Sequence, residues 1–133
     1  MKNQRSELST KNKYWIPKFR YLELKNYCLQ YPDWQKELAQ ISILQTHSQI
    51  SPAGNFSDPT YTVVLKRARL QQNINLIEDT ASKADDFLAK WIIKGVTESL
   101  SYEFLHLQLS MPASRDTYYD RYRKFFWILD QMR

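Results

Sequence analysis

Residues 98–126 read ESLSYEFLHLQLSMPASRDTYYDRYRKFF, and this stretch decides the fold of the chain. Its first half predicts a short helix over 102–109, because Ser101 is a suitable N-cap. The flanking residues Leu100 and Leu105 can pack against each other across that cap as a hydrophobic staple. The direction in which the chain enters this helix is therefore defined by the sequence itself.

A second helix follows after a short turn. Ser110, Met111 and Pro112 end the first helix. Ser114 caps the second, and Asp116 suits the positive end of that helix. Along the second helix, aromatic and apolar residues at i, i+4, i+7, i+11 and i+14 predict a buried stripe: Tyr118, Tyr122, Phe125, Leu129 and Met132. The stretch therefore predicts a helix–turn–helix.

The outer side of the second helix carries groups that suit duplex DNA. We expect the following side chains to face outwards: Ser114, Arg115, Asp116, Tyr119 and Arg123. Base edges in the major groove present distinct donors and acceptors, and Arg115 is the natural guanine reader. Arg121, Arg123 and Lys124 lie where a recognition helix leaves the groove, so they would neutralise phosphates.

The quoted stretch resembles the helix–turn–helix of bacterial sigma-factor region 4, which usually reads glycine, leucine, serine, tyrosine and two glutamates, and later leucine, glycine, isoleucine and proline. Ser114, Thr117, Arg123 and Lys124 are also similar to a serine, a threonine and an arginine–lysine pair in the RinA/ArpU-type late-gene regulators of Gram-positive phages. The resemblance in motif covers about thirty residues, and the layout of the whole chain is also similar. It implies an activator of a phage or mobile-element operon that acts with RNA polymerase.

Two departures from this pattern change what we expect of the site. Ser110 stands where the turn usually has glycine, and a left-handed serine costs on the order of 1 kcal/mol. Asp116 and Asp120 offset Arg115 and Arg121, so the helix alone supplies little affinity for DNA. A basic arm or a second subunit is therefore expected to contribute, which favours a homodimer.

Outside this stretch, residues 1–13 form a polar basic arm, and 14–57 comprise a helical hairpin and a linker. One expected helix buries Tyr21, Leu24, Cys28 and Tyr31. The other begins with Pro32 at its first position and buries Trp34, Leu38, Ile41 and Leu44. The hairpin or a second subunit must cover the apolar run FFWIL at 125–129.

Residues 58–133 form the third region, which comprises a long helix and the helix–turn–helix. Asp58 and Pro59 are expected to open the long helix, and its apolar side carries Val63, Leu70, Ile74, Ile77 and Ala81. The next segment, KADDFLAKWIIKGV at 83–96, has the spacing of a fourth helix with a stripe of Ala84, Phe87, Leu88, Trp91, Ile92 and Gly95. Lys66, Arg67 and Arg69 are interpreted as a solvated face rather than a phosphate track.

Composition supports an all-α fold of five or six helices. The chain has 133 residues, 43% of them hydrophobic, but only 2 glycines and 5 prolines, too few for a β-sandwich with frequent tight turns. The net charge of +5 permits binding to a polyanion. A single cysteine and the absence of a long apolar run predict a cytoplasmic protein that does not enter membranes.

An enzyme is the least supported class. His47 and His106 have no second ligand at metal spacing, Cys28 reads as a buried thiol, and no glycine-rich phosphate loop exists. We therefore expect no catalytic residues, no metal and no cofactor. Two alternatives to the regulator stay open: a DNA-recognition subunit of a packaging complex (small terminase-like) or of a transposition complex, and a module that uses the same motif to bind protein.

Overall fold

The computed structural model describes residues 10–47 and 58–133, with side chains described for 10–44 and 61–133. Within these ranges it contains six helices and no strand: α1 Lys18–Leu29, α2 Tyr31–His47, α3 Asp58–Ala84, α4 Ala89–Glu98, α5 Tyr102–Gln108 and α6 Arg115–Met132. This confirms the all-α fold. Most of the predicted basic arm, the linker and the side chains of His47, Asp58 and Pro59 lie outside the described residues.

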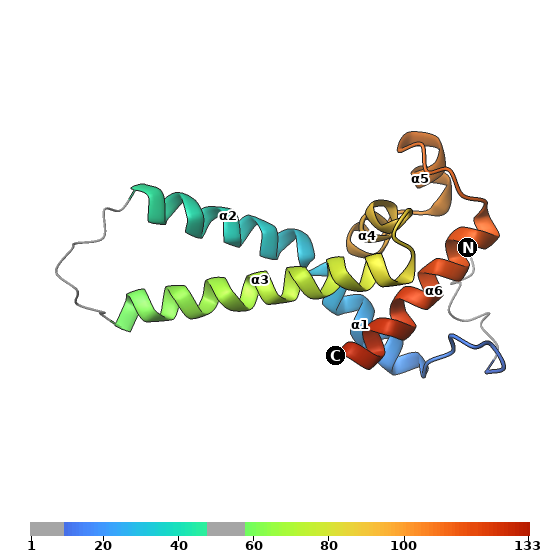
Figure 1. Ribbon diagram of the computed structural model, residues 1–133, viewed down its shortest axis with the longest axis horizontal. Helices are drawn as coiled ribbons and strands as arrows, with labels where there is room; N and C mark the ends of the chain where they lie inside the picture. The colour runs from blue at the N-terminus through green and yellow to red at the C-terminus, as the bar shows by residue number, and fades with distance from the viewer. Residues whose placement is uncertain (1–9, 48–57) are drawn as a thin grey trace.

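The helices form a body from which one helix pair projects (Figure 1). α2 and the N-terminal half of α3 lie side by side and extend away from the rest of the molecule. The C-terminal half of α3 continues into the body, where it packs against α4 and α6, and α1 covers α4 and α6. The helix–turn–helix therefore lies at the end of the molecule opposite the projecting pair.

The first two helices do not form the predicted hairpin with each other. Only Gln30 separates them, and it keeps a right-handed helical backbone (φ −81°, ψ −12°), so it bends the chain without reversing it. α2 instead lies along α3, because α1 uses its buried face against α4 and α6. The joint is fixed by Tyr27 and Tyr31, whose hydroxyls donate to Asn73 at 3.0 Å and to Glu78 at 2.6 Å.

Most of the predicted apolar stripes are buried. On α1 and the start of α2 the buried members are Tyr21, Leu24, Cys28, Tyr31 and Trp34, and on α3 they are Leu70, Ile74, Ile77 and Ala81. The predictions for Val63 and Leu44 are wrong, because both side chains are exposed. These two residues belong to the projecting pair, beyond the reach of the body.

The fourth helix starts later than the sequence predicts. Ala84 is the last residue of α3, and α4 begins at Ala89. Between them the Asp85 carboxylate accepts a hydrogen bond from the backbone N–H of Leu88 at 3.0 Å, which stabilises a turn in place of a continuous helix. Phe87 consequently points into solvent, 73% exposed, and does not join the core as expected.

The apolar run at 125–129 is covered from within the chain. Phe125, Phe126 and Leu129 are buried, and the ring of Tyr21 on α1 meets Phe126 edge-on at 5.0 Å. The hydroxyls of Tyr21 and Tyr122 are 2.8 Å apart. Of the two covers that the sequence left open, the N-terminal region supplies this one. None of the described helices is long and apolar enough to span a membrane.

Candidate nucleic-acid interface

α5 is held in place by hydrogen bonds at its start and by a buried residue in its middle. Ser101 caps it as predicted, because its hydroxyl accepts a hydrogen bond from the Phe104 N–H at 3.1 Å. Leu105 is fully buried below the helix. The hydroxyl of Tyr102 donates to the Ala113 carbonyl at 2.8 Å, so the start of α5 is tied to the residue that precedes the cap of α6.

The turn between α5 and α6 contains the expected left-handed serine. Ser110 has φ 55°. The N–H groups of Leu109 and Met111, on either side of it, both donate to the Leu105 carbonyl, at 3.1 and 3.0 Å. Met111 is fully buried and closes the turn from below. The turn is thus well bonded although serine replaces the usual glycine.

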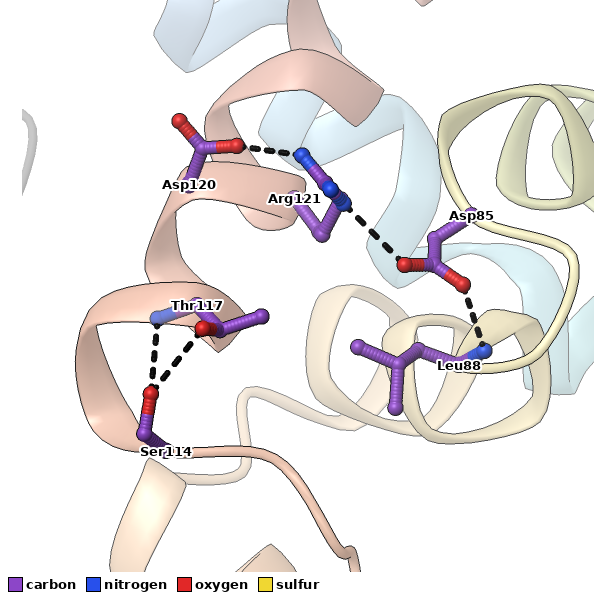
Figure 2. Close-up of polar contacts among 6 residues, drawn as sticks. All are labelled: Asp85, Leu88, Ser114, Thr117, Asp120 and Arg121. Carbon is purple, nitrogen blue, oxygen red and sulfur yellow. Dashed lines mark hydrogen bonds and ion pairs between the residues drawn. The ribbon is translucent and has the colours of Figure 1, made fainter.

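α6 begins with the predicted cap. The Ser114 hydroxyl accepts from the Thr117 N–H at 3.2 Å and donates to the Thr117 hydroxyl at 3.0 Å, as Figure 2 shows. This cap satisfies one of the backbone donors left free at a helix start. The first turn that follows is open to solvent, since Ser114, Arg115, Asp116 and Thr117 are all exposed.

The remaining predicted site residues are less exposed. Tyr119, Arg121, Arg123 and Lys124 are half-buried, so Tyr119 and Arg123 offer less surface to solvent than the sequence predicts. The Tyr119 ring packs edge-on against Tyr118 at 5.1 Å and Tyr122 at 5.9 Å, as part of the aromatic cluster beneath α6. The exposed polar surface of this helix is therefore concentrated in its first turn.

Arg115, the predicted guanine reader, has an acidic partner. Its guanidinium forms an ion pair with Glu103 of α5 and lies over the Tyr119 ring, 5.3 Å from the centroid. The pKa of Glu103 is lowered, first by a hydrogen bond from its own backbone N–H at the start of α5 and also by Arg115. Both side chains of the pair are about half exposed, so solvent screens the attraction.

Arg121 joins α6 to the turn between α3 and α4. Its guanidinium donates to Asp85 at 3.0 Å and to Asp120 at 2.6 Å (Figure 2). The pKa of Arg121 is raised, chiefly by the bond to Asp85. Asp85 therefore bonds both Arg121 and the Leu88 N–H, and Arg121 holds the body together at the position where we expected a phosphate contact.

Sequence reasoning missed three residues that position this site. The helical spacing puts Asp85 inside a predicted helix, although Asp is a frequent turn residue. Glu103 is the second residue after the Ser101 cap, near the positive end of α5, and that place marks it as an acid close to the site. Tyr102 gave no signal, because its bond to Ala113 depends on how the two helices fold together.

Nothing in the described part of the chain gathers three or more His, Cys, Asp or Glu side chains into a group that could hold a metal ion. Comparisons with protein-family models, curated proteins and solved structures gave no match.

Proposed function

We propose that this protein binds double-stranded DNA through α5 and α6 and regulates transcription of a phage or mobile element, acting with RNA polymerase. The observation that supports this best is the start of α6. A capped helix presents a hydroxyl, a guanidinium, a carboxylate and a second hydroxyl to solvent in one turn, on Ser114, Arg115, Asp116 and Thr117. Such a turn matches the N-terminal residues of a recognition helix in the major groove.

In this proposal Arg115 changes partner when DNA binds. The free protein keeps its guanidinium on Glu103, and because solvent screens an exposed pair of this kind, the pair adds little stability. A bidentate contact to guanine discriminates by about 1–3 kcal/mol. Arg115 therefore gives up little when it leaves Glu103 for a base, and Glu103 keeps Arg115 oriented until a duplex arrives.

Removing the charge of Glu103 tests this exchange. The substitution Glu103→Gln frees Arg115 and removes a negative charge near the DNA, so the affinity for a duplex should rise about 3- to 10-fold at low salt. Glu98→Gln is the matched control, because Glu98 forms an exposed pair with Lys94 at 2.9 Å on α4. Fluorescence anisotropy on a duplex pool measures both. Equal responses of the two variants, or no binding by the parent chain, would contradict the proposal.

A second pair of variants separates base reading from phosphate contact. Arg115→Ala should relax selection at one base position by about 1–3 kcal/mol, whereas Lys124→Ala should weaken all duplexes alike and reduce the salt dependence. Selection from a randomised duplex library measures the preference of each variant. An unchanged site preference in Arg115→Ala would show that α6 does not read bases through this residue.

The regulator differs from a packaging or transposition subunit in what it does at a promoter. An activator of the proposed kind should increase full-length transcript when added to host RNA polymerase and a late promoter of its own element. Tight site-specific binding with no change in transcript, together with a stable complex with a nuclease or ATPase subunit, would favour the packaging class. Failure to bind duplex DNA even at low ionic strength would favour the protein-binding module.

A further inference from the structure

The projecting helix pair exposes apolar side chains that the body does not reach. We call residues 33–44 of α2 and 61–73 of α3 the helical arm; it extends away from the other helices (Figure 1). Its exposed large apolar side chains lie on both helices, toward the end distant from the body: Ile43, Leu44, Tyr61, Val63, Val64 and Leu65. Within this distal part, residues 38–44 and 61–65 contain no charged side chain.

The arm includes a helical segment that solvent alone would not stabilise. Residues 61–64 read YTVV, an aromatic residue followed by three β-branched ones, and each of these has lower helix propensity than alanine or leucine. Helices of such sequences owe their stability to packing of an apolar face. The side chains from 61 to 69 remain exposed although α3 packs along α2, so a second molecule on this face would add packing that the single chain supplies only in part.

One face of the arm is hollowed. A groove of about 420 Å³ runs between the two helices, with Trp34, Leu65 and Leu70 among its apolar lining residues and Glu37, Lys66 and Arg69 among its charged ones. Tyr61 precedes Leu65 by four residues and Leu44 follows Glu37 by seven, so both extend this face beyond the groove. Lys66 and Glu37 pair at 3.4 Å, and Arg69 adds a second cation beside the one carboxylate.

We propose that the occupant of this face is the arm of a second copy of the chain. An isologous interface must complement itself under a two-fold rotation, and this face has the required content: apolar residues to meet the same apolar residues, and charges of both signs, so that Arg69 of each copy can meet Glu37 of the other.

The size of the arm suits a small dimer interface. A standard interface uses roughly 20–30 residues and about 800 Å² from each partner; the helical arm has 12 residues in α2 and 13 in α3, of which those on one face can enter the interface. The α5–α6 unit stays outside the interface. The purpose of the dimer, two recognition helices at neighbouring half-sites, rests on the proposed function, but the interface itself does not.

Sedimentation of the full chain without DNA tests the inference. The parent chain should form a dimer in a series from about 1 to 100 µM, a range that resolves micromolar affinities. Leu65→Glu should weaken the association at least tenfold, since it places a carboxylate in an apolar interface. Phe87→Glu is the control, because Phe87 is equally apolar and more exposed, 73% against 47%, but lies off the arm. Circular dichroism checks that each variant keeps its helices.

Exchanging the charges at positions 37 and 69 between two copies gives the most specific test of the dimer. Arg69→Glu and Glu37→Arg should each weaken self-association by placing like charges together. Mixed in equal amounts, the two variants should form a heterodimer about as stable as the parent dimer, because position 69 of each copy then faces an opposite charge at position 37 of the other. The substitutions lie on the exposed face of the arm, and their folds are checked in the same way.

Three results would overturn the inference: a parent chain that stays monomeric throughout the series, equal weakening by Leu65→Glu and Phe87→Glu, or charge variants that do not recover on mixing. A separate duplex titration distinguishes this failure from failure of the proposed function. A chain that dimerises but binds no DNA would support the dimer and contradict the proposed function. A chain that stays monomeric and binds DNA would contradict the dimer and support DNA binding.

Discussion

A glycine at position 95 sets the distance between α4 and α6, because Tyr118 of α6 packs directly against it. Gly95 is buried in α4, and a Cβ atom built on it would overlap the hydroxyl of Tyr118 and lie 3.3 Å from the Tyr118 Cζ and 3.4 Å from a methyl of Leu105. The Tyr118 hydroxyl is buried with no hydrogen-bond partner among the described residues. α4 therefore approaches α6 closely only because position 95 has no side chain.

Gly95→Ala should consequently destabilise the protein by about 1–3 kcal/mol, the usual cost of overpacking, although alanine favours helices more than glycine does. Tyr118→Phe removes the clashing hydroxyl, and since that hydroxyl is unpaired its loss should cost little or be stabilising. In the Tyr118→Phe background, Gly95→Ala should then cost clearly less than in the parent. Urea denaturation of the four proteins gives the coupling, and additive effects would contradict this packing.

Cys28 illustrates what burial does to a reactive group. The thiol is fully buried, and burial raises its pKa to about 12, so in the folded chain it stays protonated at neutral pH. The thiolate is the species that reacts with disulfide reagents. Cys28 should therefore react about 100-fold or more slowly with such a reagent in the native protein than in denaturant at pH 8, because reaction requires opening of the fold.

The raised pKa of Cys28 also determines how the stability of the fold changes with pH. The folded pKa of Cys28 lies above its unfolded value of about 8.5, so the stability that it contributes is complete below that pH and is lost as the pH rises toward about 12. Absorbance assays of thiol labelling from pH 7 to 10 follow both effects. Labelling as fast in buffer as in denaturant would show that α1 is not packed as described.

At the scale of helices, short-range signals were predictable and long-range partners were not. The caps at Ser101 and Ser114 could be predicted, because a cap is decided within four residues of chain. The helix boundary next to Gln30 could also be predicted, from Pro32, but the bend that replaces a hairpin there could not, because it depends on which helix lies opposite. The turn at Asp85 could not be predicted, because helical spacing continues through it in the sequence. For the same reason the exposure of Arg115 was predictable but not its pairing with Glu103 on another helix.

The turn between α5 and α6 offers a test at this scale. Ser110 has φ 55°, a left-handed conformation that glycine adopts freely. Ser110→Gly should therefore raise the free energy of unfolding by about 1 kcal/mol. Ser101→Gly is the control of opposite sign, because Ser101 has φ −73° and its side chain caps α5, so that change should cost a few tenths of a kcal/mol. Thermal denaturation measures both, and a loss of stability in Ser110→Gly would contradict the observed turn.

At the scale of the whole molecule, α6 connects the proposed DNA interface to the core. Its first turn is exposed, while its later turns pack against α1, α3 and α4. Within the described residues, three ion pairs join this helix to other parts of the chain: Arg115 with Glu103 of α5, Arg121 with Asp85 at 3.0 Å, and Asp130 with Arg20 of α1 at 2.7 Å. The apolar stripe of α6 could be predicted from its period except at Met132, which is exposed and not buried as expected. The number of helices that pack on this stripe could not be predicted, because that depends on how α1 and α3 cross α6.

Phe125 should therefore contribute to the stability of the whole fold and not only to a single contact. It is fully buried, and its ring meets that of Phe126 edge-on at 5.1 Å, inside the surface where α6 is covered. Phe125→Ala should lower the free energy of unfolding by about 3–5 kcal/mol, since it removes apolar contacts and leaves a cavity. Leu107→Ala serves as the control, because Leu107 on α5 is 73% exposed and should change stability by no more than about 0.5 kcal/mol. Guanidinium denaturation followed by tryptophan fluorescence measures both variants. If the denaturation midpoint of Phe125→Ala differed from that of the parent no more than the midpoint of Leu107→Ala does, α6 would not connect the body in the way its packing indicates.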